Sequence, residues 1–203
     1  MFINKSNGGE NVECSRFIVA GEDKKSLSIM KNALVESGYT FAGYAHDTVG
    51  ILRHVRSLAP DLIILDVKGS FGSLRPSIEV IDEELLSAII LLLDFRSDEI
   101  FDFITKTRIV TYIAKPLFSE VAQQIADISL ANFKRIIQYE DQVKRLNDSL
   151  ESRKSVEKAK WILVEQDGLS EEEAYNVIRK KSRDNRVPMR NISDAIIMIR
   201  GNK

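Results

Sequence analysis

The sequence of 203 residues has few of the side chains that build disulfide or metal sites, and it has no long apolar stretch. Its single cysteine, Cys14, cannot form an intrachain disulfide, and one cysteine with two histidines argues against a structural zinc site. No run approaches the 18 or so apolar residues of a membrane-spanning helix, and residues 1–15 lack the apolar core of a signal peptide. We therefore expect a soluble, cytoplasmic protein.

The net charge of the chain is also close to zero, but the charged residues are unevenly distributed along it. The 29 Lys and Arg and the 30 Asp and Glu give a net charge of −1, which indicates neither a generally basic chain nor an acidic, disordered one. Residues 1–150 hold 17 basic and 21 acidic groups, whereas residues 151–203 hold 12 basic and 9 acidic groups. The sequence therefore predicts an acidic first part and a basic second part.

Short apolar runs alternate with helical spacing in the first part of the chain. Continuous apolar runs are typical of strands buried on both faces of a parallel sheet. We expect five strands, at residues 17–20, 40–45, 62–65, 88–93 and 109–113. Helices are expected between them, although residues 69–76, with Gly69 and Pro76, indicate a loop. The alternation predicts an α/β doubly wound, five-stranded parallel sheet.

Polar side chains follow four of the predicted strands: Glu22 and Asp23, Asp66, Asp94 and Lys115. Because ligands of such sheets bind at the carboxyl ends of the strands, we expect these side chains to lie close together. Converging carboxylates require a cation, and Mg²⁺ prefers oxygen ligands, while a lysine can pair with a phosphoryl group. The alternative is that each is simply a polar residue that ends a strand.

Residues 16–130 resemble a response-regulator receiver domain, which has a flavodoxin-like fold. The resemblance lies in PDLIILD, which ends at Asp66, and in YIAKP, which contains Lys115. It implies that Asp66 is the phosphoacceptor and that Lys115 pairs with the phosphate. It further implies that Tyr112 is the aromatic switch residue and that Glu22, with Asp66, binds Mg²⁺.

Several residues depart from the receiver pattern. Gly21 stands where the family has its first metal-binding acid, and Leu93 replaces the Ser or Thr whose hydroxyl binds the phosphoryl oxygen. The lost hydroxyl removes a hydrogen bond of about 1.5–3 kcal/mol, and Asp94 adds a carboxylate that repels a phosphoryl group. Lys68 could pair with Asp66 instead. We therefore expect a degenerate receiver, weakly phosphorylated or not at all, with weakened Mg²⁺ binding.

Residues 119–166 contain neither Pro nor Gly, which predicts one long helix. Five apolar residues within it alternate at spacings of three and four: Ile136, Tyr139, Val143, Leu146 and Leu150. This heptad pattern predicts a coiled coil between two parallel copies of the chain. The alternative is a helix that packs on its own protein.

The last part of the chain predicts a small three-helix domain. Ser170 and Glu173 form a capping box at the start of one helix, and Pro188 suits the first turn of the next. Four residues of the last helix are expected to share one face: Ile192, Ala195, Ile196 and Ile199. No catalytic residues are predicted here, because the domain has no acid/base pair, nucleophile arrangement or metal-ligand cluster.

Basic side chains and one aromatic ring share a face of the middle helix. Tyr175, Arg179 and Arg183 are spaced four residues apart, which places them on one side. Aromatic and Arg side chains together suit single-stranded bases and their phosphates. The alternative is a solvated helix face with Tyr175 partly in the core.

Residues 146–199 resemble an ANTAR domain, the RNA-binding output module of certain transcription antiterminators. The resemblance is carried by the run SRKSVEKAKWILVEQDGLSEEEAYNVIRKKS, although Trp161 stands where the family usually has Gly. It implies binding of paired hairpins in nascent leader transcripts. The residues expected to contact RNA are Lys158, Lys160, Tyr175, Arg179, Lys180 and Arg183.

Together these features predict four segments: a flexible arm (1–15), a receiver-like domain (16–130), a coiled-coil dimerisation helix (131–150) and an ANTAR domain (151–203). We expect a transcription antitermination regulator whose receiver-like domain controls or supports dimerisation, with a sensor kinase or sensor protein as a further partner. Two alternatives remain: a DNA-binding response regulator, and a partner-docking regulatory protein without direct nucleic-acid binding.

Overall fold

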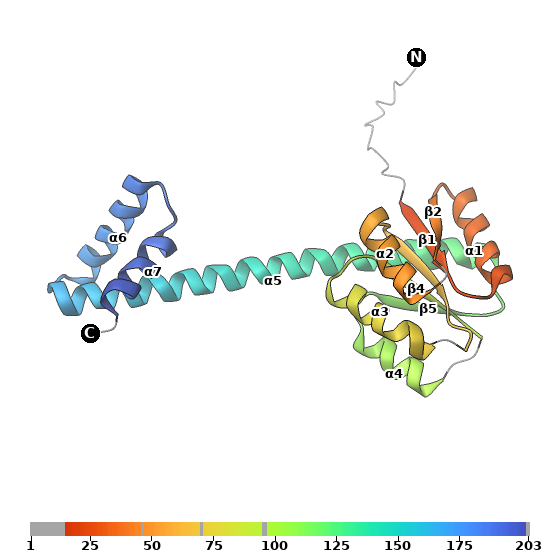
Figure 1. Ribbon diagram of the computed structural model, residues 1–203. Coiled ribbons are helices and arrows are strands. Elements are labelled where there is room, and N and C mark those ends of the chain that lie inside the picture. Colours follow the sequence, from red (N-terminus) through yellow and green to blue (C-terminus); the bar gives the residue numbers. More distant parts are fainter. Residues whose placement is uncertain (1–14, 46, 70, 95–96, 202–203) are drawn as a thin grey trace, which may run out of the picture. The chain divides into compact units, whose positions relative to one another are not determined.

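The first part of the chain folds around a five-stranded, all-parallel sheet (Figure 1). The computed structural model describes residues 15–45, 47–69, 71–94 and 97–201; the predicted arm, except for Ser15, lies outside them. The strands are β1 (Arg16–Ala20), β2 (Thr40–Ala45), β3 (Leu62–Asp66), β4 (Ala88–Leu93) and β5 (Val110–Ala114). Their spatial order is β2-β1-β3-β4-β5, which confirms the predicted doubly wound sheet.

Helices cover both faces of this sheet. One face carries α2 (Thr48–Leu58), α3 (Phe71–Glu83) and α4 (Asp98–Lys106); the other carries α1 (Lys24–Glu36) and the start of α5 (Ser119–Asp167) (Figure 1). β3 and β4 lie in the middle of the sheet, and every residue in them is buried. This double coverage explains why their sequences are apolar without alternation, apart from the final Asp66.

The predicted loop over residues 69–76 is wrong, because α3 begins at Phe71 and includes Pro76. Phe71, Leu74 and Ile78 recur at helical spacing and are buried, and the Phe71 ring packs edge-on against Phe103 of α4 at 5.2 Å. A proline inside a helix removes one backbone hydrogen bond and costs roughly 3 kcal/mol. Burial of the apolar face outweighs that cost.

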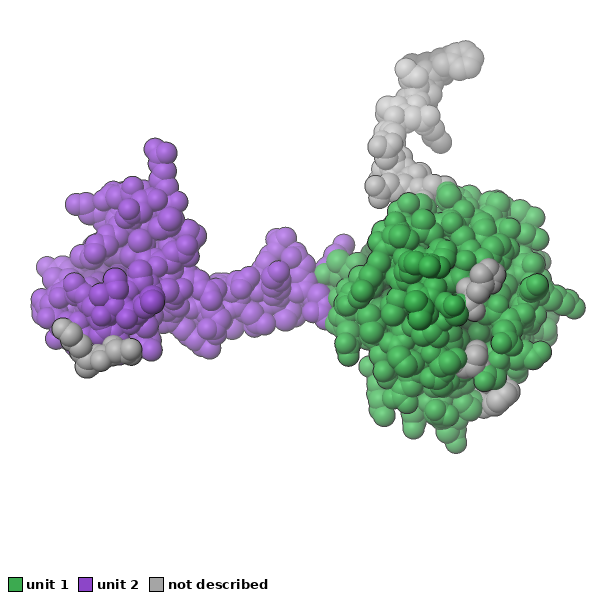
Figure 2. All heavy atoms as spheres, in the orientation of Figure 1, with its two compact units in different colours: residues 1–137 green, residues 138–203 purple. Residues whose placement is uncertain are grey.

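The chain divides into two compact units, residues 1–137 and 138–203, and α5 contributes to both (Figure 2). In the first unit, Ala122, Ala126 and Phe133 of α5 are buried against the sheet. In the second, α5 packs with α6 (Glu171–Asn185) and α7 (Met189–Arg200). The predicted segment boundaries remain predictions, although a capping box between Ser170 and Glu173 is present where the sequence indicates it.

Only part of the apolar face of α7 is buried. Ile196 is buried and Ile192 packs against the same small core, but Ala195 and Ile199 are exposed. Ser193 is fully buried instead. Its hydroxyl donates a hydrogen bond to the carbonyl oxygen of Met189 within the helix. A polar residue can therefore occupy the core side without an unsatisfied group.

No helix in the described part of the chain is long and apolar enough to span a membrane.

Candidate functional site

A lysine stands among three carboxylates at the carboxyl edge of the sheet. The Lys115 ammonium nitrogen lies 2.5 Å from Asp66 Oδ1, 3.0 Å from Asp23 Oδ2 and 3.2 Å from Asp94 Oδ1. The Asp66 side chain is completely buried and that of Lys115 is 10% exposed. The structure thus brings together Asp23, Asp66, Asp94 and Lys115, as the sequence predicts, but leaves Glu22 outside this cluster.

The positions of these groups follow from the ends of the strands. Asp66 is the last residue of β3, while Asp94 and Lys115 directly follow β4 and β5. The Lys115 N–H donates to the carbonyl oxygen of Leu93, which fixes the lysine beside β4. The Asp23 N–H donates to Asp66 Oδ2 at 2.9 Å, so the loop after β1 is held on the same carboxylate.

Asp23 has a second task as the N-cap of α1. Its carboxylate accepts hydrogen bonds from the hydroxyl and N–H of Ser26 and from the N–H of Lys25. The hydrogen bond from the Ser26 side chain, followed by that from Lys115, holds the pKa of Asp23 well below its usual value. Asp23 is therefore a fixed anion that joins the helix start to the lysine.

The ammonium of Lys115 is correspondingly stabilised in its charged form. Burial opposes the charge, but hydrogen bonds to the three carboxylates, Asp66 first, outweigh burial and raise the pKa of Lys115 above its usual range. The lysine is thus a permanent cation in a site that carries three acidic groups.

Gly21 is required by the position of Asp66. Its φ angle of +134° lies in the region that favours glycine, and a Cβ atom built there would lie 2.5 Å from the Cβ of Asp66. The acid that the receiver pattern places at this position therefore cannot be accommodated in this backbone. The same conformation directs the chain so that Asp23 approaches Asp66.

The residues predicted to bind Mg²⁺ are not arranged as a metal site. Glu22 is exposed and lines a hollow with Asp47 and Thr48, whereas Asp23 contacts Lys115. Within the described residues, no three acidic, His or Cys side chains are placed to hold a metal ion together. Because the Lys115 ammonium already lies between the carboxylates, the residues as arranged do not fit a divalent cation.

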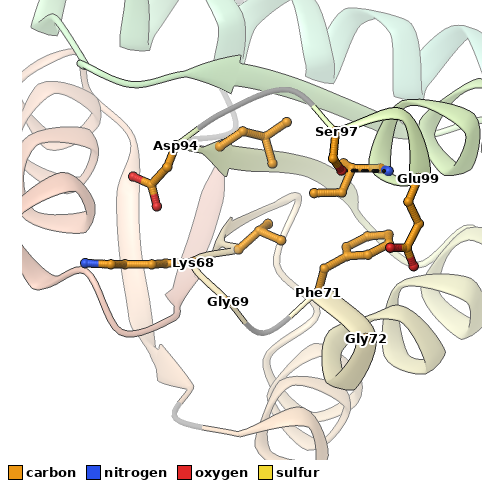
Figure 3. A pocket seen from close by; sticks show the side chains of 10 residues that line it. Lys68, Gly69, Phe71, Gly72, Asp94, Ser97 and Glu99 are labelled. Carbon is orange, nitrogen blue, oxygen red and sulfur yellow. Dashed lines mark hydrogen bonds between the residues drawn. The ribbon is translucent and has the colours of Figure 1, made fainter.

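A hollow of about 390 Å³ opens beside this cluster, between β3 and β4 and the helices that follow them (Figure 3). Phe71, Leu93 and Ile100 give it apolar walls. Ser97 also lines it, but its hydroxyl accepts a hydrogen bond from the Ile100 N–H as the N-cap of α4. Leu93 is buried where the receiver pattern has a hydroxyl, so its side chain offers no hydrogen bond to a phosphoryl oxygen.

Two further predictions concern Lys68 and Tyr112. Lys68 and Asp94 extend toward the same side of the hollow, but among the described residues Lys68 makes no ion pair with Asp66, which binds Lys115 (Figure 3). Tyr112, the predicted switch residue, is half-buried on β5 and packs against the core of the sheet. The switching role of Tyr112 remains a prediction.

The predicted coiled-coil residues lie on α5. Ile136 is half-buried against the core of the first unit. The other four are all more than half exposed: Tyr139 by 62%, Val143 by 52%, Leu146 by 65% and Leu150 by 53%. These four residues, which we call the α5 seam, form an exposed apolar stripe that no other described residue of the chain covers.

The basic residues predicted for RNA binding do not form a single face. Tyr175, Arg179 and Arg183 lie along α6 and are exposed, as is Lys180. Lys160 points toward α6, where its ammonium binds Glu157 at 2.9 Å and Glu171 at 3.0 Å. An RNA phosphate would have to displace these two carboxylates from the Lys160 ammonium.

Lys158 is exposed on α5, but it lies only two residues from Lys160. Because successive helical residues are rotated by about 100°, these two side chains leave the helix on nearly opposite sides. The α6 face made by Tyr175, Arg179 and Arg183 is therefore the coherent part of the predicted set.

Sequence reasoning indicated which residues lie at the strand ends but not how they meet. Asp23 was expected near Lys115, but its approach to the lysine depends on the loop after β1, where Gly21 has a φ angle of +134°. Arg153 and Glu157 line a hollow with Tyr175, and only the packing of α5 against α6 reveals it.

Comparisons with known proteins find similarity in both parts of the chain. A model of the ANTAR domain family matches residues 144–197. The transcriptional regulatory protein PdtaR of Mycobacterium tuberculosis, from strains CDC 1551 / Oshkosh and ATCC 25618 / H37Rv, is 25% identical over 183 residues, which covers 90% of this chain and 89% of the relative.

Solved structures resemble the first part of the chain in fold. The signal receiver domain of a modulated diguanylate cyclase from Desulfovibrio desulfuricans G20 has a TM-score of 0.51 at 16% identity, covering 59% of this chain and 95% of its own. A response regulator from Thermotoga maritima has a TM-score of 0.50 at 21% identity, covering 58% and 98%. The chain therefore combines a first part that has the receiver fold with an ANTAR domain matched at residues 144–197.

Proposed function

We propose that this protein is a transcription antitermination regulator that binds hairpin RNA in nascent leader transcripts through its ANTAR domain. The ANTAR match at residues 144–197 and the likeness to a transcriptional regulatory protein support a regulatory rather than an enzymatic role. Binding would hold the transcript in a form that prevents a terminator hairpin, so that transcription continues.

The observation that carries the proposal is the exposed face of α6. Tyr175 is 42% exposed and is followed, one and two turns later, by the exposed Arg179 and Arg183. An aromatic ring offers a stacking surface to an unpaired base, and the guanidinium groups neutralise phosphates. The described residues place no carboxylate within ion-pair distance of either arginine, so both are available to RNA.

Two copies of the chain would act together. The α5 seam exposes four large apolar side chains on one stripe, and a second, parallel copy would bury them in heptad register. A dimer presents two ANTAR domains, which suits a target with two hairpins.

We further propose that the receiver-like domain works without stable phosphorylation, as a dimerisation or docking domain. Lys115 already neutralises Asp66, Leu93 offers no hydroxyl, and Asp94 adds a negative charge beside the acceptor. Incubation with acetyl phosphate or beryllofluoride and Mg²⁺ should leave Asp66 largely unmodified by mass spectrometry. Stoichiometric modification with a change in oligomeric state would refute this part of the proposal.

The RNA-binding proposal is tested by recovering host transcripts on the purified protein and sequencing them. We expect enrichment of leader transcripts that share a hairpin-loop consensus. The variant Arg179→Glu/Arg183→Glu should lose that enrichment, whereas a matched charge reversal on the receiver-like domain, Arg53→Glu/Lys106→Glu, should keep it. Stronger capture of duplex DNA than of hairpin RNA in competition would favour a DNA-binding regulator, and full retention after reversal at Arg179 and Arg183 would favour partner docking.

A further inference from the structure

The hollow of about 390 Å³ beside the lysine–carboxylate cluster takes no part in the proposed RNA binding (Figure 3). Its volume lies within the range of small-ligand pockets, about 300–1,000 Å³, and toward the lower end of it. Gly69 and Gly72 both belong to the lining, and a Cβ atom built on either would meet nothing within 4 Å. The absence of side chains at these two positions helps to keep the hollow open.

The walls of this hollow are apolar and well packed. Val67 and Leu93, which lie at the ends of β3 and β4, are 5% and 4% exposed. Phe71, at the start of α3, is held by an edge-on contact with the Phe103 ring at 5.2 Å. The half-buried Ile100 of α4 adds to the same lining. Such walls suit the ring or branched chain of a small ligand.

The charged groups at the hollow carry an excess of negative charge. Three carboxylates share Lys115, and one of them, Asp94, lines the hollow with its side chain 38% exposed. Glu99 also lines it, and no Lys or Arg side chain of the described residues lies within ion-pair distance of this carboxylate. Lys68 contributes an ammonium to the lining. The balance favours a ligand with a positive charge and disfavours a carboxylate or a phosphate.

The charges lie at different sides of the hollow. Lys68 and Asp94 stand at one side, whereas Glu99 stands at the other, nearer to Phe71 (Figure 3). A cation that pairs with Glu99 is therefore kept apart from the Lys68 ammonium by the apolar walls. The Glu99 carboxylate also has acceptor sites to offer, since no described basic side chain occupies them.

We propose that this hollow binds a small amphipathic amine, whose apolar part packs on Phe71 and Leu93 and whose ammonium pairs with Glu99. The inference goes beyond the RNA-binding function and does not depend on it. A ligand of this class gives the receiver-like domain a chemical input in place of phosphoryl transfer to Asp66, which the contacts of Lys115 with Asp66 and Asp94 oppose.

The test compares three probes that share a phenyl ring and a two-carbon chain: phenethylamine, 2-phenylethanol and phenylacetate. Each is titrated into the full-length protein and followed by ligand-observed NMR. We expect phenethylamine to bind about three-fold more tightly than 2-phenylethanol, the size of a partly exposed ion pair, and phenylacetate to bind most weakly.

Two substitutions test the role of the carboxylate. Glu99→Gln should remove the advantage of phenethylamine and leave the binding of 2-phenylethanol unchanged. Asp98→Asn is the matched control, because Asp98 lies in the same first turn of α4 but not in the lining of the hollow. It should keep the advantage. Equal loss in both variants would show that only the general negative charge of the helix start matters, and would overturn the inference.

Gly72→Leu tests the location, because it adds a branched apolar side chain at the wall of the hollow. It should abolish phenethylamine binding, while thermal unfolding checks that the protein is folded. Should it not fold, the comparison of Glu99→Gln with Asp98→Asn decides alone. Phenethylamine binding that persists in folded Gly72→Leu, a preference for phenylacetate, or no binding of phenethylamine would each overturn the inference. None of these outcomes involves RNA, so a failure of the proposed function would be distinct from them.

Discussion

The ammonium of Lys115 lies 2.5 Å from the carboxylate of Asp66, and the Asp66 side chain is inaccessible to solvent. Removing one partner of such a buried pair leaves an uncompensated charge, which typically costs 3–5 kcal/mol. Because Asp23 and Asp94 share the same lysine, the loss of Lys115 would leave three carboxylates to repel one another.

Lys115→Met should therefore lower the free energy of unfolding by about 3–5 kcal/mol at neutral pH, measured by urea denaturation. The destabilisation should shrink as the pH falls and the carboxylates take up protons. Lys68→Met removes an exposed lysine from the same edge of the sheet and should change stability by less than about 0.5 kcal/mol. Equal effects of the two substitutions would contradict a central role for Lys115.

The depressed pKa of Asp23 predicts a loss of stability in acid. The pKa of Asp23 is lower in the folded than in the unfolded chain, so its contribution is fully present above the unfolded value of about 3.9 and is lost as the pH falls toward the folded value. Urea denaturation of the parent protein at pH 6, 4 and 3 should show stability falling across this range. Asp23→Asn should flatten that dependence, and an unchanged slope would show that other carboxylates account for it.

Gly21→Ala should destabilise the protein, because the residue has φ +134° and its new Cβ would collide with the Cβ of Asp66. Backbone strain of this kind costs on the order of 1–3 kcal/mol, before the cost of the clash. Gly72→Ala is the matched control, since a Cβ there meets nothing within 4 Å and the residue lies in α3. That change should stabilise the protein by about 0.5–1 kcal/mol. A neutral effect of Gly21→Ala in thermal unfolding would mean that the loop can rearrange.

Charging the α5 seam should weaken self-association. Leu146→Lys/Leu150→Lys would place like charges opposite each other in a parallel coiled coil and forfeit burial worth about 1.5–3 kcal/mol per leucine. The dimer dissociation constant from sedimentation equilibrium should rise at least about tenfold. Met198→Lys alters a side chain that is 84% exposed on α7 and should leave the constant unchanged. A monomeric parent protein, or a dimer insensitive to the seam, would refute the proposed interface.

The salt dependence of RNA binding should distinguish the electrostatic contribution of Arg179 from the stacking contribution of Tyr175. If about four phosphates are neutralised per protomer, log affinity for a hairpin should fall with log salt at a slope near −3, and Arg179→Gln should make that slope shallower by roughly 0.7. Tyr175→Ala should weaken binding by about 1–3 kcal/mol while leaving the slope unchanged, because it removes a stacking surface and no charge. Filter binding at about six salt concentrations, from about 50 to 300 mM, measures both the affinity and its slope against salt. Unaltered affinity of Tyr175→Ala would place the ring outside the interface.

Much of the fold could be predicted because its signals are local. The apolar runs of β3 and β4 indicate buried parallel strands. Because strand ends of a parallel sheet meet at one edge, the sequence also predicts that Asp66 lies near Lys115. α3 was not predicted because Pro76 is a strong local signal against a helix. The burial of Phe71 and Ile78, which favours the helix, depends on contacts with residues elsewhere in the chain. On α7, the spacing of the apolar residues does not indicate that Ser193 is buried. Its hydroxyl donates a hydrogen bond to the carbonyl oxygen of Met189, which makes a polar residue acceptable in the core.

The sequence by itself determined the strands, the long helix and the types of charged group available at each site. Only the tertiary structure decided which of them meet. The positive φ of Gly21 turns the loop after β1 so that Asp23, rather than Glu22, reaches Lys115. The packing of α5 against α6 joins Lys160 to Glu171 and sets Glu157 beside Tyr175. Such pairings depend on backbone geometry and on contacts between distant segments, which the spacing of residues along a chain does not encode.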